Sequence, residues 1–366
     1  MQLVPYRTDY VFRAATRFTR RNPFLTAALY FVVSYGGLYL LGFLTGRLDG
    51  FGEIAPYLSS SDVGVIVDNI SLAFLAPVGA GLLCVLYAKI EGAFSYIESE
   101  RILDNESDRV EHAAFVEMVD RLYNSRAAAI IGLVAAASFS AYNYVGKTGT
   151  WLSIDGGLPG LWGRFFITIN YYIVVTILYK CAVSVWALQK TLAHDIRVRP
   201  LHPDRCGGLQ PIGSLSIAIN NFLALVIFWC ALLSFFDSYA QRQVIYAVAF
   251  ALLYAAAPFL LFGSLAKAHK VMLREKNTAL DRLSATFEKH YERLTRGPKE
   301  RSLDVSSADE IVKVHSLYRI VTAMPVWPFD MRSLRRVGGT FLVPLLLFLI
   351  KQATSDTGFL RKLFGG

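Results

Sequence analysis

The hydrophobic residues of this chain are gathered into long blocks that short polar segments separate. The six clearest blocks approach the length of about 20 residues that crosses a bilayer as a helix. They cover residues 24–44, 65–87, 127–145, 165–187, 215–236 and 244–262. A seventh run, 337–350, is short for a span: it either crosses with help from its flanks or lies as a re-entrant or interfacial helix. We favour crossing, and the pattern predicts an all-α polytopic membrane protein with six or seven spans.

Lysine and arginine concentrate in alternate segments between these blocks, which predicts the side of the membrane that each segment faces. The first block follows Arg20-Arg21-Asn22-Pro23 and is too long for a signal peptide, so we expect a retained anchor with a cytosolic N-terminus. The expected organisation has four parts. These are a basic N-terminus (1–23), a transmembrane bundle (24–264) with cytosolic segments 89–126 and 189–214, a cytosolic helical hairpin (265–336), and a C-terminal membrane segment with its tail (337–366).

A heptad pattern predicts that the sixth span continues as a helix into the cytosol. Leu273, Leu280, Phe287 and Leu294 recur every seven residues, as in a coiled-coil seam. A second cytosolic helix is expected after the break at Arg296-Gly297-Pro298. The seam has two interpretations that the sequence leaves open: a hairpin within one chain, or a contact between copies of the chain.

The composition agrees with a membrane protein. Of 366 residues, 54% are hydrophobic and 18% are charged, whereas soluble domains have about 45–50% apolar and about 25% charged residues. The net charge of +9 lies in the loops. The positive-inside rule and contact with anionic lipid account for it, and we favour this over a surface for nucleotide or nucleic acid. The four cysteines are scattered and form no disulfide framework.

Residues 197–213, which we call the Pro-Gly loop, contain the most distinctive local chemistry. Three prolines and the pair Gly207–Gly208 exclude an ordinary helix. A metal site from nearby histidine, aspartate and cysteine matches no standard spacing, so we predict no metal ligand. The residues of that rejected set are His194, Asp195, His202, Asp204 and Cys206. If the loop binds anything, its basic residues favour a phosphate. The predicted ligand contacts are Arg197, Arg199, His202, Asp204 and Arg205.

Several polar residues fall inside the predicted spans, where they are costly unless they face each other or water. They are Asp68, Asn69, Asn143, Asn170, Lys180, Asn220 and Asn221. One interpretation is hydrogen bonding between helices, and the other is a polar path in which Lys180 favours anions or screens cations. The sequence has no nucleophile elbow, HExxH pair or phosphate loop, so we expect neither an enzyme nor a cofactor.

Two boxes carry a resemblance: RPLHPDRCGGL between two spans, and MPVWPFDMRSLRR before the last apolar run. The second half of the chain resembles a family of uncharacterised bacterial multi-pass inner-membrane proteins, which implies a bacterial inner-membrane location but no activity. More distantly, the architecture is similar to oligomeric pore-type membrane effectors of anti-phage defence systems. Some of those are controlled by nucleotides or short nucleic acids.

These observations favour an oligomeric ion-channel-like protein in the lipid bilayer, gated through its cytosolic helices. The expected partners are further copies of the chain, a cytosolic nucleotide or single-stranded nucleic acid, and a protein bound by the cytosolic helices. An antiviral defence role follows from the resemblance alone. Two other classes remain open: a small-solute transporter, and a non-conducting scaffold for a soluble partner.

Overall fold

The computed structural model describes most of the chain, with gaps at several connections. The described residues are 3–46, 74–99, 106–145, 157–194, 196, 198–199, 202–204, 206–236, 240–295, 305–329 and 331–354. Within these ranges all regular elements are helices, which confirms the all-α prediction. Two short π-helical turns, η1 and η5, interrupt longer helices.

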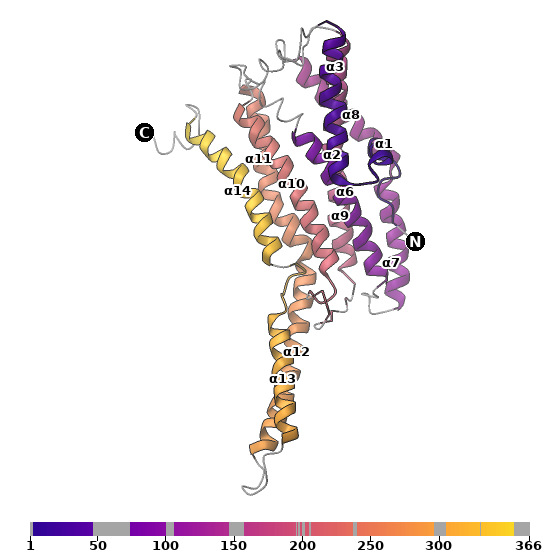
Figure 1. Cartoon of the computed structure of the whole chain (residues 1–366). Coiled ribbons are helices and arrows are strands. Elements are labelled where there is room, and N and C mark those ends of the chain that lie inside the picture. Colours follow the sequence, from indigo (N-terminus) through magenta and orange to yellow (C-terminus); the bar gives the residue numbers. More distant parts are fainter. Residues whose placement is uncertain are drawn as a thin grey trace.

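The helices follow one another as a series of long rods (Figure 1). In the first half they are α1 (Tyr10–Thr19), α2 (Pro23–Phe31), η1 (Val32–Gly36), α3 (Gly37–Leu44), α6 (Ala76–Ser99), α7 (Glu106–Tyr123), α8 (Arg126–Val145) and α9 (Leu158–Thr191). In the second half they are α10 (Gln210–Phe236), α11 (Ala240–Pro258), η5 (Phe259–Gly263), α12 (Ser264–Thr295), α13 (Val305–Ala323) and α14 (Met331–Thr354).

Seven of the helical stretches within the described residues are long and apolar enough to cross a membrane. The protein is therefore a polytopic helical membrane protein. The run that looked short in sequence belongs to α14, whose 24 residues extend about 36 Å at 1.5 Å per residue. That length suffices for the hydrocarbon core, about 30 Å thick.

Three spans form the interior and the others surround them. The spans in α6, α9 and α10 are each 56% buried, whereas the spans beginning at Val110, Ile245 and Ser333 are 17%, 22% and 11% buried. α10 contacts α6 and α9 on one side and α11 and α14 on the other. The outer spans therefore leave most of their apolar surface to lipid or to another chain.

Several helices extend beyond the predicted span boundaries, and burial explains the extension at two of their C-terminal ends. α6 continues to Ser99, beyond the expected end of its span near Tyr87, because Ile90, Phe94 and Ile97 are fully covered by the core. α9 runs to Thr191 for the same reason, with Leu188 completely buried. The helices thus extend past the expected membrane boundary as one packed unit with α7, whose Phe115 contacts Trp186 of α9.

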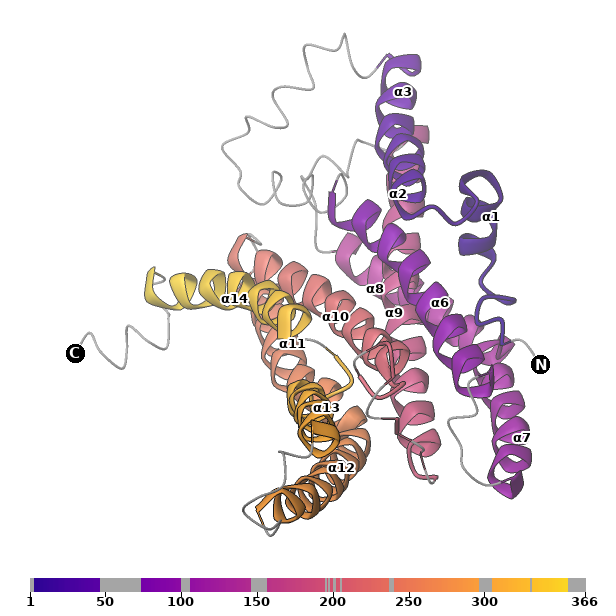
Figure 2. The same cartoon turned by 60° about the horizontal axis from the view of Figure 1, so that its bottom comes forward.

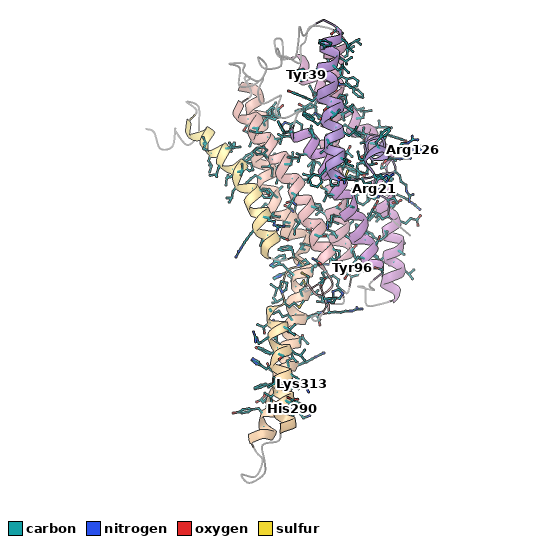
Figure 3. The ribbon with its side chains drawn as sticks, in the orientation of Figure 1. Arg21, Tyr39, Tyr96, Arg126, His290 and Lys313 are labelled. Atoms are coloured by element: carbon teal, nitrogen blue, oxygen red, sulfur yellow. The ribbon has the colours of Figure 1, made fainter. Side chains whose placement is uncertain are left out.

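The predicted hairpin is formed by α12 and α13, which lie side by side and project away from the bundle (Figures 1 and 2). Near its far end, His290 Nδ1 lies 2.8 Å from Glu310 Oε2, and Figure 3 shows His290 and Lys313 there. The 32 residues of α12 correspond to about 48 Å of helix. Within one chain, therefore, α13 packs against the heptad helix.

Each helix of the hairpin joins a membrane span. α12 follows α11 through the π-helical turn η5, which begins after Pro258. α13 joins α14 through residues 324–329, which we call the junction segment. α14 is held on the bundle by aromatic packing, with the rings of Phe250 and Phe348 stacked at 4.4 Å between centroids. Both ends of the hairpin are therefore joined to membrane spans.

Candidate functional site

The Pro-Gly loop is shaped by one carboxylate. Asp204 Oδ1 accepts hydrogen bonds from the amides of Cys206 (2.9 Å) and Gly208 (3.0 Å), and Asp204 Oδ2 accepts one from Gln210 (3.2 Å). Gln210 is the first residue of α10, so Asp204 also satisfies an amide at that helix N-terminus. His202 Nδ1 lies 2.8 Å from Asp204 Oδ1.

These donors set the ionisation of Asp204. Burial alone would raise the pKa of its carboxyl group, but the amides of Gly208 and Cys206, the His202 ring and the Gln210 amide outweigh it. The pKa therefore lies below the ordinary aspartate value. A carboxylate with this many internal donors is a structural anion that organises the loop.

The glycines of the loop are required by backbone geometry. Gly207 and Gly208 have φ of +68° and +89°, a region that other residues rarely adopt. A Cβ at Gly207 would also run into the Val198 side chain and lie 2.9 Å from Met324 Cε. The loop turns back on itself here, where Arg199 N donates to Gly207 O (3.1 Å).

The Pro-Gly loop packs directly on the junction segment, so the two boxes that stand far apart in sequence meet in space. The closest approach is at Gly213 in the first turn of α10, where a Cβ would collide with the Pro328 carbonyl. Cys206 and Leu209 of the Pro-Gly loop and Phe329 of the junction segment are buried and form part of the main hydrophobic core.

The hairpin side of this contact is also fixed. The His269 ring of α12 stacks on Trp327 with centroids 4.2 Å apart, and His269 Nδ1 lies 2.8 Å from Val326 O. Lys276 Nζ donates to the carbonyls of Thr322 and Met324 at 2.7 Å each, which satisfies the C-terminal end of α13. The junction segment is therefore packed between α12 and the Pro-Gly loop.

The structure describes only part of the predicted ligand set. Arg197 and Arg205, and Asp195 of the rejected metal set, lie outside the described residues. Arg199 is exposed, while His202 and Asp204 are partly buried against each other. Across the described ranges, no three histidine, cysteine, aspartate or glutamate side chains are grouped to hold a metal ion. Phosphate binding by this loop remains a prediction.

The predicted polar residues of the spans are separated into local contacts. Tyr30 OH donates to Asn170 Oδ1, and Asn220 Nδ2 donates to Ser216 O at 3.0 Å. Asn221 is half-buried. Asp68, Asn69 and the side chain of Asn143 lie outside the described residues. No hydrogen bond joins Asn170, Lys180 or Asn220 to one another in the described part of the chain. The polar path stays a prediction.

Lys180 is the centre of a buried network that the sequence did not reveal. Its ammonium group donates to Pro5 O and to Tyr123 O (2.5 Å), and lies 5.5 Å and 5.7 Å from the ring centroids of Tyr87 and Tyr123. Tyr123 ends α7, so the charge satisfies a helix C-terminus. Its side chain is only 3% exposed.

Two carboxylates complement this cation. Asp9 caps α1 by accepting from Phe12 N (3.0 Å), and it accepts a second hydrogen bond from Tyr87 OH (2.7 Å). Burial raises the pKa of Asp9, and Lys180 opposes that shift. Asp120 on α7 also interacts with Lys180 through its charge. Arg7 Nη1 lies 3.5 Å from Asp120 Oδ2, so two basic side chains face the two carboxylates.

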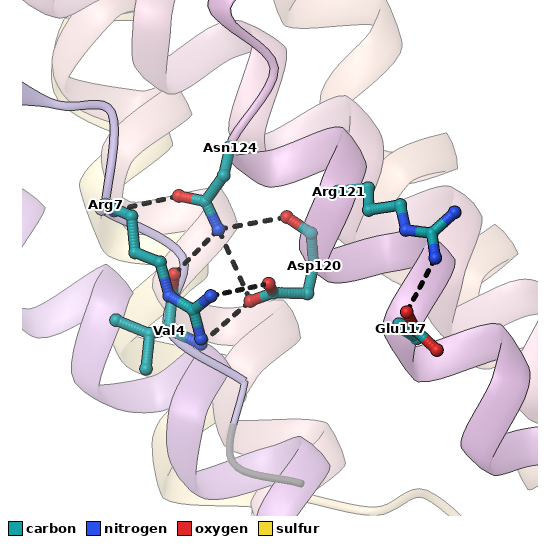
Figure 4. A network of polar contacts seen from close by, with 6 residues as sticks. All are labelled: Val4, Arg7, Glu117, Asp120, Arg121 and Asn124. Atoms are coloured by element: carbon teal, nitrogen blue, oxygen red, sulfur yellow. Dashed lines mark hydrogen bonds and ion pairs between the residues drawn. The ribbon is translucent and has the colours of Figure 1, made fainter.

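The N-terminal segment is fastened by the same region, as Figure 4 shows. Val4 N donates to Asp120 Oδ1 (3.1 Å), and Arg7 N donates to Asn124 Oδ1 (2.8 Å). Asn124 Nδ2 returns a bond to Val4 O (2.9 Å). Residues 3–9, part of the predicted basic N-terminus, are thus bound to the end of α7. We call this segment the N-terminal strap. Asp9 was not identified from the sequence: its type could have suggested a helix cap, but its tertiary partners lie far along the chain.

Comparison with known proteins adds no identity to these sites. No family model matches the chain, and neither the curated proteins nor the solved structures searched contain a match to it.

Replacing Asp204 with asparagine should lower the free energy of unfolding by about 1–3 kcal/mol, because an amide cannot accept all three N–H groups. The folded-state pKa is depressed, so the stabilisation is fully present above the ordinary value of about 3.9 and disappears as pH falls through the folded-state pKa. The difference in melting temperature between wild type and Asp204→Asn in detergent should therefore shrink on acidification. Asp309→Asn, at an exposed carboxylate on α13, is the control. A difference that stays constant down to about pH 3 would contradict this role.

Replacing Lys180 with methionine should destabilise the protein by about 3–5 kcal/mol, because Asp9 would remain buried without its cation. The double variant Lys180→Met/Asp9→Asn should recover part of that loss, measured as non-additive melting shifts in detergent. Lys89→Met, at an exposed lysine on α6, should change little. Strictly additive effects of the two buried substitutions would show that these charges act independently.

Proposed function

We propose that this protein is an oligomeric, channel-like membrane protein in which the α12–α13 hairpin is the gating arm. The observation that carries the proposal is the connection of both hairpin helices to membrane spans, α12 to α11 and α13 to α14. A ligand or partner that binds the arm differently in two states would change the position of α14 relative to α11.

A hinge at the base of the arm supports this mechanism. Pro258 removes one backbone hydrogen bond from α11, and the π-helical turn η5 follows at once. π-helical turns and prolines are common sites of bending in helices. The junction segment, in contrast, is gripped on both sides. The connection through η5 can therefore bend, while the junction segment passes a movement of the hairpin on to α14.

Assembly of several copies is supported by the surface of the arm. Large apolar side chains are exposed along both of its helices. They are Leu273, Phe287, Tyr291, Val312, Leu317, Tyr318 and Ile320. α13 therefore covers the heptad seam only in part, and exposed apolar rows of this kind favour association. In this proposal further copies of the chain cover these rows.

The proposal also includes the side of the membrane that the arm faces and the ligand that controls it. The alternation of basic segments supports a cytoplasmic arm and N-terminus in a bacterial inner membrane. The resemblance to defence effectors supports a nucleotide, a single-stranded nucleic acid or a protein as the gating partner.

A non-conducting scaffold is the second candidate, and the buried polar contacts favour it. Lys180 and Asn170 are directed to partners inside the chain. A pore in the described part of the chain would have to be built from other groups or from several subunits. The scaffold shares the exposed arm but predicts no ion movement.

Replacing Phe287 with glutamate should weaken association about ten- to a hundredfold, as loss of about 1.5–3 kcal/mol of apolar burial implies. Association is measured by subunit exchange in detergent, and ion flux by dye-loaded liposomes with and without candidate oligonucleotides. Thr286→Glu, at the neighbouring exposed position, is the matched control.

The channel-like proposal expects flux from the wild type and the control, and less from Phe287→Glu. Stable oligomers with no conductance under any condition would favour the scaffold. Unchanged association of Phe287→Glu would contradict the arm as the assembly surface.

A further inference from the structure

A recess opens between the end of α9 and the first turn of α12, apart from the sites described above. Its volume is about 360 Å³, within the range of about 300–1,000 Å³ that holds small ligands. Trp186, Gln189 and Lys190 line it from α9, and Gly263, Ser264 and Lys267 line it from η5 and α12. Two segments far apart in the sequence thus form one concave surface.

The recess lies where two membrane spans end. Lys190 is in the last turn of α9, and Lys267 is in the first turn of α12, directly after η5. Both helices belong to apolar stretches that can cross a membrane. Trp186 suits such a boundary, because its ring is amphipathic. The hydropathy pattern ends these spans near residues 187 and 262, which puts the recess at the level expected for lipid headgroups.

The described residues of the recess carry positive charge, from Lys190 and Lys267. Neither Lys190 nor Lys267 has a hydrogen bond or an ion pair to the described residues, and both side chains are exposed. None of the described residues lining the recess is acidic. Gln189 and Ser264 add polar groups, and Leu192 contributes an apolar wall. A single anion between the two ammonium groups would relieve their repulsion.

We propose that this recess binds the phosphate of an acidic phospholipid headgroup. Lysines act as point charges toward phosphate, and basic pockets between membrane helices at this depth bind anionic headgroups. The apolar wall accommodates the glycerol end of the lipid. The ligand chemistry is a phosphate ester, and its position at the span ends assigns it to lipid.

Binding here has a mechanical consequence. The phosphate would join α9, a buried span, to the first turn of α12, next to the π-helical turn at the base of the hairpin. A lipid in the recess would therefore hold the root of the hairpin against the bundle. The inference does not rest on channel-like activity, because lipid binding is measured without flux.

The test compares the charge-removing variant Lys190→Gln/Lys267→Gln with the charge-matched control Lys289→Gln/Lys313→Gln. The control residues are exposed on the hairpin, and Figure 3 shows Lys313 near its far end. A third variant, Gly263→Leu, fills the recess without changing charge; a Cβ at Gly263 meets nothing within 4 Å, so this variant should fold. The melting temperature of each protein is measured in mixed micelles with phosphatidylglycerol, with phosphatidylcholine, or with soluble glycerol phosphate.

Phosphatidylglycerol should stabilise the wild type and the control. The apparent affinity should fall roughly ten- to thirtyfold in Lys190→Gln/Lys267→Gln, since each lysine contributes about 1 kcal/mol near a charged surface. Gly263→Leu should lose the effect as well. If glycerol phosphate stabilises with the same variant dependence and the lipid does not, the site takes phosphate from solution, and the lipid assignment is overturned. Equal loss in the charge-matched control, or no dependence on phosphate in any form, would overturn the site itself.

Discussion

The close approach of Gly213 to the Pro328 carbonyl is the contact on which the arrangement of bundle and hairpin depends. There is no space for a side chain, so α10 and the junction segment meet backbone to backbone. Asp204 holds the loop that leads into this contact, and the Trp327 stack on His269 holds the other side. The hairpin is consequently not a flexible appendage: its return path to the membrane passes through a packed joint.

The connection from the bundle into the hairpin differs from the packed joint through which the chain returns. α11 continues into α12 through a proline and a π-helical turn, where backbone hydrogen bonding is already irregular. In the proposed mechanism, a rigid joint beside a bendable one would convert rotation of the hairpin into a displacement of α14 relative to α11. In the N-terminal half of the molecule, a buried charged group connects the elements. Lys180 of α9 donates to Pro5 O of the N-terminal strap and to Tyr123 O at the end of α7, and Asp9 lies close enough to interact with its charge. The N-terminal half of the bundle is thus stabilised by hydrogen bonds around a buried lysine.

The helical class and the continuation of the sixth span as a helix could be predicted from the sequence, because each depends on local composition or spacing. The meeting of the boxes could not be predicted, since Gly213 and Pro328 are separated by most of the second half of the chain. The partners of Lys180 were missed for a related reason: they include backbone carbonyls of Pro5 and Tyr123, which carry no side-chain signal. Helix ends were displaced where burial outweighed polarity, as at Ile90 and Ile97 of α6.

The most direct test of the central claim is the distance between the hairpin and the bundle in reconstituted protein. Spin labels at Met118 on α7 and Lys289 on α12, two exposed positions, report it. We expect one narrow distance distribution for the wild type and for Gly338→Ala, where a Cβ meets nothing within 4 Å. We expect a broad distribution for Gly213→Ala, because the joint would be forced apart. A broad distribution in the wild type, or an unchanged narrow one in Gly213→Ala, would contradict a packed joint at the root of the hairpin.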